Sequence, residues 1–208
     1  MTHVLIVDDE RLIQELFARY IDAASDRYTL AETTGDAANA ELICQNTKVD
    51  LVLMDVCTAN DSSGLDAAAA IKRRFPRIKV IIVTSVPEYR FIEKARAAGA
   101  DSFWYKDIGE GELLEVMDRT MAGESIYPDR TPEVTIGVAT SYDFTPTELE
   151  VLRYLAEGIS SRSIAGQMHV TADTVNTHIK HLKEKTGCTS KTQLAVLASK
   201  SRLVLPEY

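Results

Sequence analysis

The first 120 residues alternate between short apolar runs and segments of helical character, and this alternation limits the possible folds more than any other feature. The runs contain residues that favour strands: His3–Val7, Tyr28–Glu32, Leu51–Met54, Val80–Val83 and Ser102–Tyr105. Five repeats of strand and helix favour a parallel sheet with helices on both faces. We therefore predict an α/β doubly wound fold with a five-stranded parallel sheet.

Helix patterns between these runs are readable from apolar spacing. The first helix carries an apolar stripe formed by Leu12, Ile13, Leu16, Phe17, Tyr20 and Ile21. Another helix is expected to begin near Pro87 and to end at Gly99, because glycine commonly terminates helices.

Polar residues lie where the predicted strands end. Asp8 and Asp9 follow the first strand, Asp55 follows the third, Thr84 ends the fourth and Lys106 follows the fifth. The carboxyl ends of parallel strands meet at one edge of a sheet, which is where open α/β sheets build their sites. We therefore expect these five residues to converge, although each residue taken singly also has a purely structural interpretation, such as helix capping.

The chemistry of this set is consistent with phosphoryl transfer. Three carboxylates in one site repel one another unless a cation lies among them, and an all-oxygen ligand set suits Mg²⁺. A carboxylate oxygen can then attack a phosphoryl donor and form an acyl phosphate. Lys106 would neutralise the phosphoryl oxygens and Thr84 would donate a hydroxyl hydrogen bond.

These residues resemble the receiver domain of bacterial two-component response regulators, a CheY-like, flavodoxin-like fold. The matching positions are Asp8-Asp9, Asp55, Thr84-Ser85 and Lys106. The resemblance implies that Asp55 is the phosphoacceptor. It also implies that Asp8, Asp9, Asp55 and the backbone carbonyl of Cys57 bind Mg²⁺.

The same resemblance implies that Lys106 stabilises the phosphoryl group, while Thr84 and Phe103 form the switch pair. The sequence departs from the family in two places. Val56–Gly64 lacks the usual Met-Pro and reaches its glycine one residue late, so we expect a longer and more mobile loop that affects phosphoryl lifetime. Phe103 replaces the more common tyrosine and has no hydroxyl group.

Residues 121–143 lose the periodic pattern and are predicted to be an interdomain linker. They contain Gly123, Pro128, Pro132 and Gly137, with four acidic residues and one basic residue. Val134–Val138 could pair as a short strand. We therefore expect a receiver domain at 1–120, a linker at 121–143 and a second domain at 144–208.

The second domain shows the spacing of short helices. Helices are expected from Thr145 to Gly158, from Ser161 to Met168, from Thr171 to Gly187 and from Lys191 to Lys200. A tight turn before a helix with Asn, Thr and Lys on its outer face fits a helix-turn-helix, although a protein-binding helical bundle has the same periodicity. This domain carries a net charge of +2 within a chain of −8.

Several short sequence motifs in this domain resemble those of the LuxR-type DNA-binding domain of the NarL/FixJ class. They are Phe144-Thr145-Pro146, Glu148, Glu150-Val151-Leu152, Ala156-Glu157-Gly158, Ile164-Ala165, Thr174-Val175, His178, Lys185 and Gly187. The resemblance implies that Asn176, Thr177 and Lys180 contact bases.

Further contacts follow from the same resemblance. Thr174 and Lys183, with Ser161 or Arg162, are expected at DNA phosphates. The last helix is expected to form a dimer contact through Leu194, Val196 and Leu197, with core packing as the alternative.

The functional expectation is a cytoplasmic response regulator, a switch and not a turnover enzyme. Its expected partners are a sensor histidine kinase, double-stranded DNA and, on activation, a second copy of the chain. No membrane association is expected. No apolar run suits a spanning helix or secretory signal, and the scattered cysteines Cys44, Cys57 and Cys188 favour a reducing compartment.

Two alternatives belong to other classes. A phosphohydrolase of the haloacid dehalogenase type would need a second acid two residues after Asp55, where this chain has Cys57. A phosphorylation-independent regulator would use the receiver only for protein contacts.

Overall fold

The computed structural model describes residues 1–106 and 110–205, which divide into two compact units. One unit comprises Met1–Ser85 and Arg90–Arg130, and the other comprises Val86–Tyr89 and the chain from Thr131 onward. Each unit has its own hydrophobic core.

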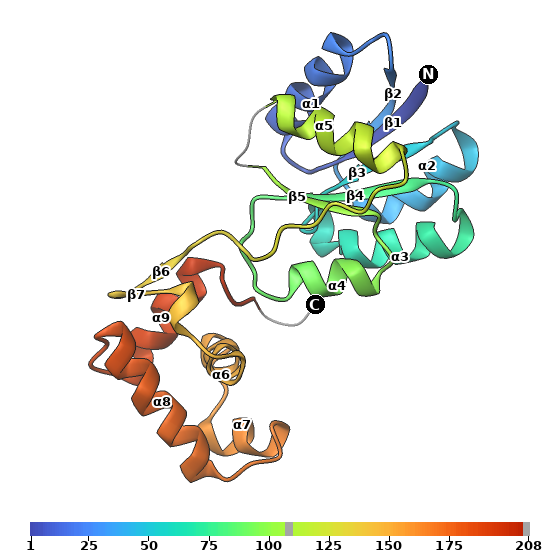
Figure 1. Cartoon of the computed structure of the whole chain (residues 1–208). Helices are drawn as coiled ribbons and strands as arrows, with labels where there is room; N and C mark the ends of the chain where they lie inside the picture. Colours follow the sequence, from blue (N-terminus) through green and yellow to red (C-terminus); the bar gives the residue numbers. More distant parts are fainter. Residues whose placement is uncertain (107–109, 206–208) are drawn as a thin grey trace. The chain divides into compact units, whose positions relative to one another are not determined.

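The first unit is built on a five-stranded sheet in which all four neighbouring pairs are parallel, in the order β2-β1-β3-β4-β5 (Figure 1). The strands are β1 (Thr2–Val7), β2 (Tyr28–Thr34), β3 (Leu51–Met54), β4 (Lys79–Thr84) and β5 (Ser102–Tyr105). The helices are α1 (Arg11–Ala23), α2 (Ala40–Asn46), α3 (Gly64–Arg74), α4 (Phe91–Ala97) and α5 (Glu110–Met121). The predicted doubly wound parallel sheet is confirmed.

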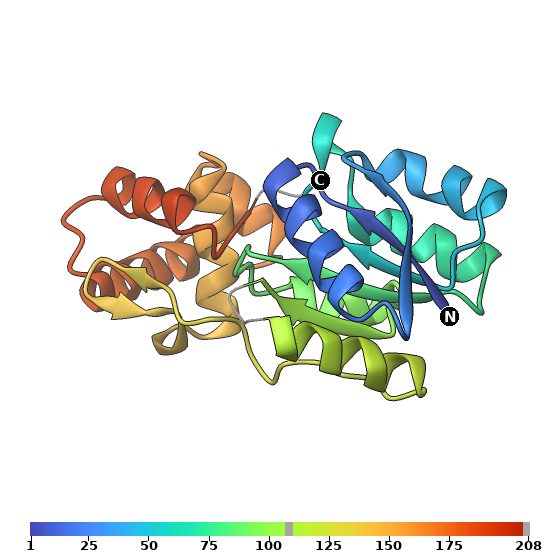
Figure 2. The same ribbon diagram turned by 90° about the horizontal axis from the view of Figure 1, so that it is seen from above.

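Helices cover both faces of this sheet. Helices α1 and α5 lie on one face, and α2, α3 and α4 lie on the other (Figures 1 and 2). Phe17 and Ile21 of α1 and Leu113 and Met117 of α5 are buried against the strands around Trp104. A strand covered on both faces is buried along its whole length, as β3 is at every position. This burial explains why all four residues of β3 are apolar.

Two expectations about these helices are corrected. Leu12 is 79% exposed and Leu16 is also exposed, so the buried stripe of α1 is narrower than the apolar pattern, because only the face centred on Phe17 and Ile21 meets the sheet. Helix α4 begins at Phe91 rather than near Pro87. The backbone N–H of Tyr89 donates to the carbonyl of Leu203 in its own unit instead of entering the helix.

In the described residues, the second unit contains a short hairpin, a 3-10 helix (Ser141–Asp143) and four α-helices. The hairpin pairs β6 (Thr135–Ile136) with β7 (Ala139–Thr140), and the helices are α6 (Pro146–Ala156), α7 (Ser161–Gln167), α8 (Ala172–Thr186) and α9 (Lys191–Ser201). Each helix has a hydroxyl N-cap that accepts a backbone hydrogen bond: Thr145, Ser160, Thr171 and Ser190.

The hairpin lies against the end of α8. The backbone N–H of Val138 donates to the carbonyl of Thr186, the last residue of α8, at 3.1 Å. Gly137 has a φ of +66°, and a Cβ at this position would lie 2.0 Å from the same carbonyl oxygen. The hairpin turn therefore needs glycine both for its backbone conformation and for its close approach to α8.

Within the described residues, no helix is both long enough and apolar enough to cross a membrane.

Candidate functional site

Three carboxylates meet at the carboxyl-terminal edge of the sheet. Strands β1 and β3 are neighbours, so Asp8 and Asp9 after β1 and Asp55 after β3 emerge side by side. The backbone N–H of Asp55 donates to the carbonyl of Val7 at 2.8 Å, which extends the pairing of these strands to the site. One oxygen from each of the three carboxylates lies within 4.8 Å of the others. The structure therefore brings together acids that are far apart in sequence.

Lys106 joins two of these carboxylates. Its Nζ lies 2.6 Å from Oδ2 of Asp8 and 2.8 Å from Oδ2 of Asp55, and its side chain is only 5% exposed. The N–H of Lys106 donates to the carbonyl of Thr84, which continues the pairing of β4 and β5. The ammonium group is thus fixed where two negative charges converge.

Burial and charge act in opposite directions on these groups. Burial raises the pKa of Asp8 to about 6, against the hydrogen bond and charge of Lys106. Burial also raises the pKa of Asp55 despite the same lysine. The pKa of Lys106 is raised, because the two carboxylates outweigh the effect of burial. A single lysine therefore does not fully compensate the acidic cluster.

The acidic cluster fits a hard divalent cation. Its ligand atoms are carboxylate oxygens, and Asp9 is exposed, which leaves room for water in the coordination shell. Mg²⁺ prefers oxygen ligands and usually keeps several waters. Asp8, Asp9 and Asp55 would hold the ion, and the backbone carbonyl of Cys57 belongs to the same strand-end segment.

Thr84 and Phe103 are both buried, Thr84 at the end of β4 and Phe103 on β5 beside Ile82. The Thr84 side chain hydrogen-bonds with Asp55, and this bond lowers the pKa of Asp55, though less than burial raises it. Phe103 is buried on β5, next to β4, and its ring centroid lies 5.0 Å from that of Tyr105 in an edge-on arrangement. The two residues of the expected switch pair thus lie on neighbouring strands.

The segment after Asp55 is held by hydrogen bonds at several points. The N–H of Val56 donates to Oδ1 of Asp55 at 2.7 Å. The buried hydroxyl of Thr58 accepts from Ala37 at 3.0 Å and donates to the carbonyl of Ser62 at 2.8 Å. A longer and more mobile loop was expected here. In the structure, polar groups of Val56 and Thr58 in this segment form hydrogen bonds.

Asp36 links this segment to the loop after β2. Its carboxylate accepts from Asn60 at 2.8 Å and from the backbone of Ala38 at 2.9 Å. Asn60 and Asp61 have φ values of 60° and 55°, a left-handed conformation that Asn and Asp tolerate better than most residues. Sequence reasoning missed Asp36, although an aspartate before a helical turn is a capping signal.

Two further residues near the site were also missed. Gln14 of α1 donates from Nε2 to the carbonyl of Asp8 at 2.6 Å, which fixes the start of the acidic segment. Gly64 lies so close to the residue after β3 that a Cβ would be 1.7 Å from the carbonyl oxygen of Asp55. No pattern in the sequence indicates the Gln14 contact, since a glutamine on a helix is usually solvent-facing.

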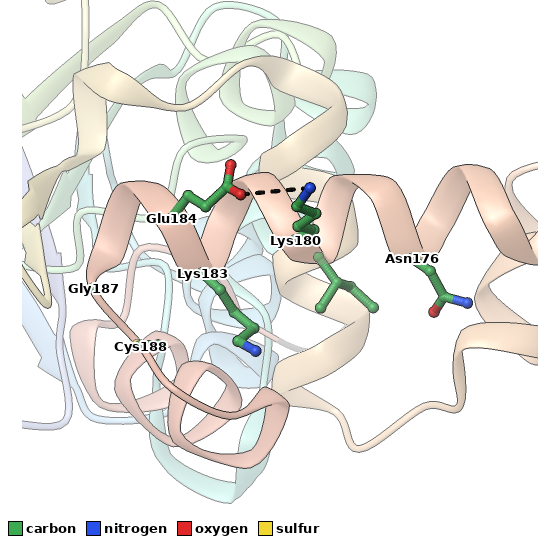
Figure 3. A pocket seen from close by; sticks show the side chains of 7 residues that line it. Asn176, Lys180, Lys183, Glu184, Gly187 and Cys188 are labelled. Carbon is green, nitrogen blue, oxygen red and sulfur yellow. Dashed lines mark ion pairs between the residues drawn. The ribbon is translucent and has the colours of Figure 1, made fainter.

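The second unit presents a polar face on α8. Thr174, Asn176, Thr177 and Lys180 are exposed, and Lys183 is partly exposed. An open groove of about 510 Å³ runs along this helix, lined by Asn176, Ile179, Lys180, Lys183, Glu184, Gly187 and Cys188 (Figure 3). Helix α8 packs on α7, which gives the helix-turn-helix arrangement expected from the sequence.

Glu148 and Lys185 hold α6 against α8. Oε2 of Glu148 lies 2.7 Å from Nζ of Lys185, and the same carboxylate accepts from the N–H of Thr145 at 2.8 Å. Burial alone would raise the pKa of Glu148, but the hydrogen bonds from Lys185 and Thr145 outweigh it and lower the pKa. This ion pair gives a structural role to Glu148 and Lys185, two of the residues that carry the resemblance to the LuxR-type domain.

Replacing Glu148 with glutamine should lower the free energy of unfolding of the second unit by about 1–2 kcal/mol at neutral pH. A carboxylate with a depressed pKa contributes stability above its ordinary value of 4.5, so the deficit should shrink as the pH falls below that value. Urea unfolding of the wild type and the Glu148→Gln variant at several pH values measures this difference in the free energy of unfolding. Glu184→Gln is the control, because the Lys180–Glu184 pair is exposed and 3.8 Å long; equal deficits in both variants would contradict the account.

The expected dimer contact is corrected at one residue. Leu194 is fully buried in the core of its own unit, so it cannot contribute to a contact between copies without unfolding. Val196 is 47% exposed and Leu197 is partly exposed. The helical spacing explains the difference, because Leu194 and Ala198 share the inner face of α9.

Comparisons with known proteins agree with this arrangement. The family model described as "Response regulator receiver domain" matches residues 4–118, and the model "Bacterial regulatory proteins, luxR family" matches residues 143–198. Response regulator protein VraR of Staphylococcus aureus (strain NCTC 8325 / PS 47) is 31% identical over 210 residues, which cover 97% of this chain and 98% of VraR.

Solved structures show the same folds. RcsB from Salmonella enterica serovar Typhimurium, bound to promoter rprA in the presence of the phosphomimetic BeF3⁻, aligns with a TM-score of 0.63 at 17% identity, covering 96% of this chain and 98% of that chain. A LuxR family DNA-binding response regulator from Silicibacter pomeroyi aligns with a TM-score of 0.53 at 28% identity, covering 62% of this chain and 98% of that chain.

The chain therefore belongs to the response regulators that carry a receiver domain and a LuxR-type helix-turn-helix domain. It is a DNA-binding two-component response regulator and a homologue of VraR.

Proposed function

We propose that this protein is a cytoplasmic switch in which a sensor histidine kinase phosphorylates Asp55 and thereby promotes dimeric DNA binding and transcription control. In this proposal the receiver domain comprises residues 1–120, the linker residues 121–143 and the DNA-binding domain residues 144–208. Linker residues 121–130 pack with the first compact unit and residues 131–143 with the second. The observation that carries the proposal is the buried Asp55 carboxylate, held beside Asp8 and joined to Lys106 at 2.8 Å.

The chemistry follows from the positions of these groups. One carboxylate oxygen of Asp55 forms a bond to the phosphorus of the donor, and the bond between phosphorus and the donor's leaving group breaks. Lys106 then pairs with the phosphoryl oxygens, and the Thr84 hydroxyl donates to them. Mg²⁺ held by Asp8, Asp9 and Asp55 would neutralise the charge of the transferred group.

A phosphoryl group adds about 1.5 to 2 negative charges to the site. Lys106 and Thr84 both have side-chain hydrogen bonds to Asp55 that can respond to the added charge. Thr84 ends β4, the strand next to the one that carries Phe103. The change is therefore expected to alter the packing of Thr84 and Phe103, which is how a local charge becomes a conformational signal.

The test of the phosphorylation step uses the full chain with Mg²⁺ and acetyl phosphate. The proposal predicts that intact-mass spectrometry shows one added phosphoryl group, which peptide mapping assigns to Asp55. An unchanged mass after prolonged incubation, or a phosphoryl group on another residue, would contradict it.

The DNA-binding step assigns different roles to residues of α8. Asn176, Thr177 and Lys180 would contact base edges in the major groove, and Thr174 and Lys183 would contact phosphates. Two copies joined through the exposed part of α9 would bind two half-sites about one helical turn apart.

Lys180→Ala and Lys183→Ala should therefore weaken binding in different ways. Loss of a base contact at Lys180 is expected to cost about 1–3 kcal/mol on selected DNA and to relax its sequence preference. Loss of a phosphate contact at Lys183 should weaken selected and random DNA equally and reduce the salt dependence. Fluorescence anisotropy on both DNAs at several salt concentrations measures this, and identical behaviour of the two variants would contradict the assignment.

A further inference from the structure

Residues 125–127, near the start of the linker, lie along the open edge of β5, the strand that carries Phe103. In the sheet order, β5 is an edge strand with only β4 as a neighbour. The N–H of Phe103 donates to the carbonyl of Ile126 at 2.7 Å. The N–H of Ile126 donates to the Ser102 hydroxyl at 3.0 Å, and the Ser125 hydroxyl donates to the carbonyl of Asp101 at 2.8 Å. Three consecutive residues, 101–103, thus hold the start of the linker.

Tyr127 continues this contact with its side chain. Its ring centroid lies 6.2 Å from that of Phe103, and its hydroxyl donates to the carbonyl of Ala100 at 2.8 Å. The guanidinium carbon of Arg96 on α4 lies 3.8 Å from the centroid of the same ring. Tyr127 is therefore held between α4 and the switch aromatic by a cation–π contact and a ring contact.

We propose that Tyr127, clamped by Arg96, is a latch that ties the linker to Phe103, so that a change at Phe103 on phosphorylation loosens the start of the linker. This inference rests on the proposed function, because it takes phosphorylation of Asp55 as the signal. All the residues that form the latch belong to the first unit, so the coupling requires no particular placement of the second.

The latch follows from the chemistry of β5 in this chain. Phe103 has no hydroxyl group, so its position is defined by packing and not by a hydrogen bond of its own side chain. One side of that packing is the linker residue Tyr127, and the backbone of Phe103 is bonded to the linker residue next to it. A displaced Phe103 therefore changes both a ring contact and a backbone hydrogen bond of the same short segment.

A purely structural role gives a different expectation. An unpaired edge strand exposes N–H and C=O groups, and covering it with the linker protects the sheet. In that case the linker contact would be the same in both states of Asp55. The two interpretations therefore differ in what happens to the Ile126 and Phe103 amides when the site is occupied.

Hydrogen exchange of the full-length wild-type chain with and without beryllofluoride and Mg²⁺ tests this difference. The latch predicts that the amides of Phe103 and Ile126 exchange at least about tenfold faster in the occupied state, because their hydrogen bonds open more often. Binding of beryllofluoride is verified separately by the ¹⁹F NMR signals of the bound anion. Unchanged exchange at both amides with the site occupied would overturn the latch.

Variants provide the second test, with Tyr127→Phe as the matched control. Tyr127→Leu removes the ring contacts with Phe103 and Arg96, whereas Tyr127→Phe removes only the hydroxyl bond to Ala100. Both should accept the phosphoryl group from acetyl phosphate as the wild type does. The gain in DNA affinity on phosphorylation should fall at least about fivefold in Tyr127→Leu and persist in Tyr127→Phe.

The outcomes separate the latch from the function on which it rests. A full gain in Tyr127→Leu, with normal phosphorylation, would overturn the latch and leave the proposed function intact. Failure of the wild type to gain a phosphoryl group would overturn both. If Tyr127→Leu does not fold, as judged by circular dichroism, the exchange experiment on the wild type still decides the question.

Discussion

Gly64→Ala is expected to lower the free energy of unfolding of the receiver unit by at least about 3 kcal/mol, because it forces two backbone segments apart. A Cβ at this position would lie 1.7 Å from the carbonyl oxygen of Asp55 and 2.8 Å from its carbonyl carbon. Neither neighbour is a flexible side chain. Accommodation must therefore move the segment that carries Asp55, and urea unfolding should show the loss.

Gly35→Ala is the matched control for this prediction. Gly35 also lies beside the acidic cluster, but a Cβ there would be no closer than 3.5 Å to its nearest neighbour, the Cα of Asp9. This is an ordinary van der Waals distance, so the stability should change by less than about 1 kcal/mol. Similar stabilities for the two variants would show that the approach of α3 to Asp55 is not a constraint on the fold.

Asp55→Asn is expected to abolish phosphoryl incorporation, at least about a 100-fold loss in rate. An amide oxygen is a much weaker nucleophile than a carboxylate oxygen, and the substitution keeps the shape of the side chain and its contact with Val56. Because Lys106 also pairs with Asp8 at 2.6 Å, it retains one partner and the fold should persist. Intact-mass spectrometry after incubation with acetyl phosphate and Mg²⁺ measures the effect.

Asp61→Asn removes the same charge from the same segment and serves as the control. Asp61 is exposed and has a φ of 55°, a conformation that asparagine tolerates. The Asp61→Asn variant should accept the phosphoryl group at the rate of the wild type. Persistent phosphorylation of Asp55→Asn, or its loss in Asp61→Asn, would contradict the assignment of Asp55 as the acceptor.

The sheet and the acidic cluster were predictable because they depend on local rules. Apolar runs such as Leu51–Met54 define buried parallel strands, and the carboxyl ends of parallel strands share one edge. The meeting of Asp8, Asp9, Asp55 and Lys106 follows from this topology and requires no knowledge of side-chain packing. Capping signals likewise predict helix boundaries such as Thr171 and Gly187 in the second unit.

Other features depend on tertiary contacts that a single sequence does not show. The exposure of Leu12 depends on which part of α1 meets the sheet, and the buried position of Leu194 depends on the inner face of α9. The start of the linker has no periodicity of its own, so its pairing with β5 through Ile126 leaves no sequence signal. The close approach of Gly64 to Asp55 also leaves no signal in the sequence, because glycine occurs in loops for many reasons.

The central claim is that a charge change at Asp55 controls DNA binding by α8. The most direct measurement is the affinity of the full chain for DNA that it selects from a random pool, with and without beryllofluoride and Mg²⁺. The account predicts at least about a fivefold tighter dissociation constant in the occupied state. Equal affinities in the two states, with occupancy of the site verified by the ¹⁹F NMR signals of bound beryllofluoride, would contradict it.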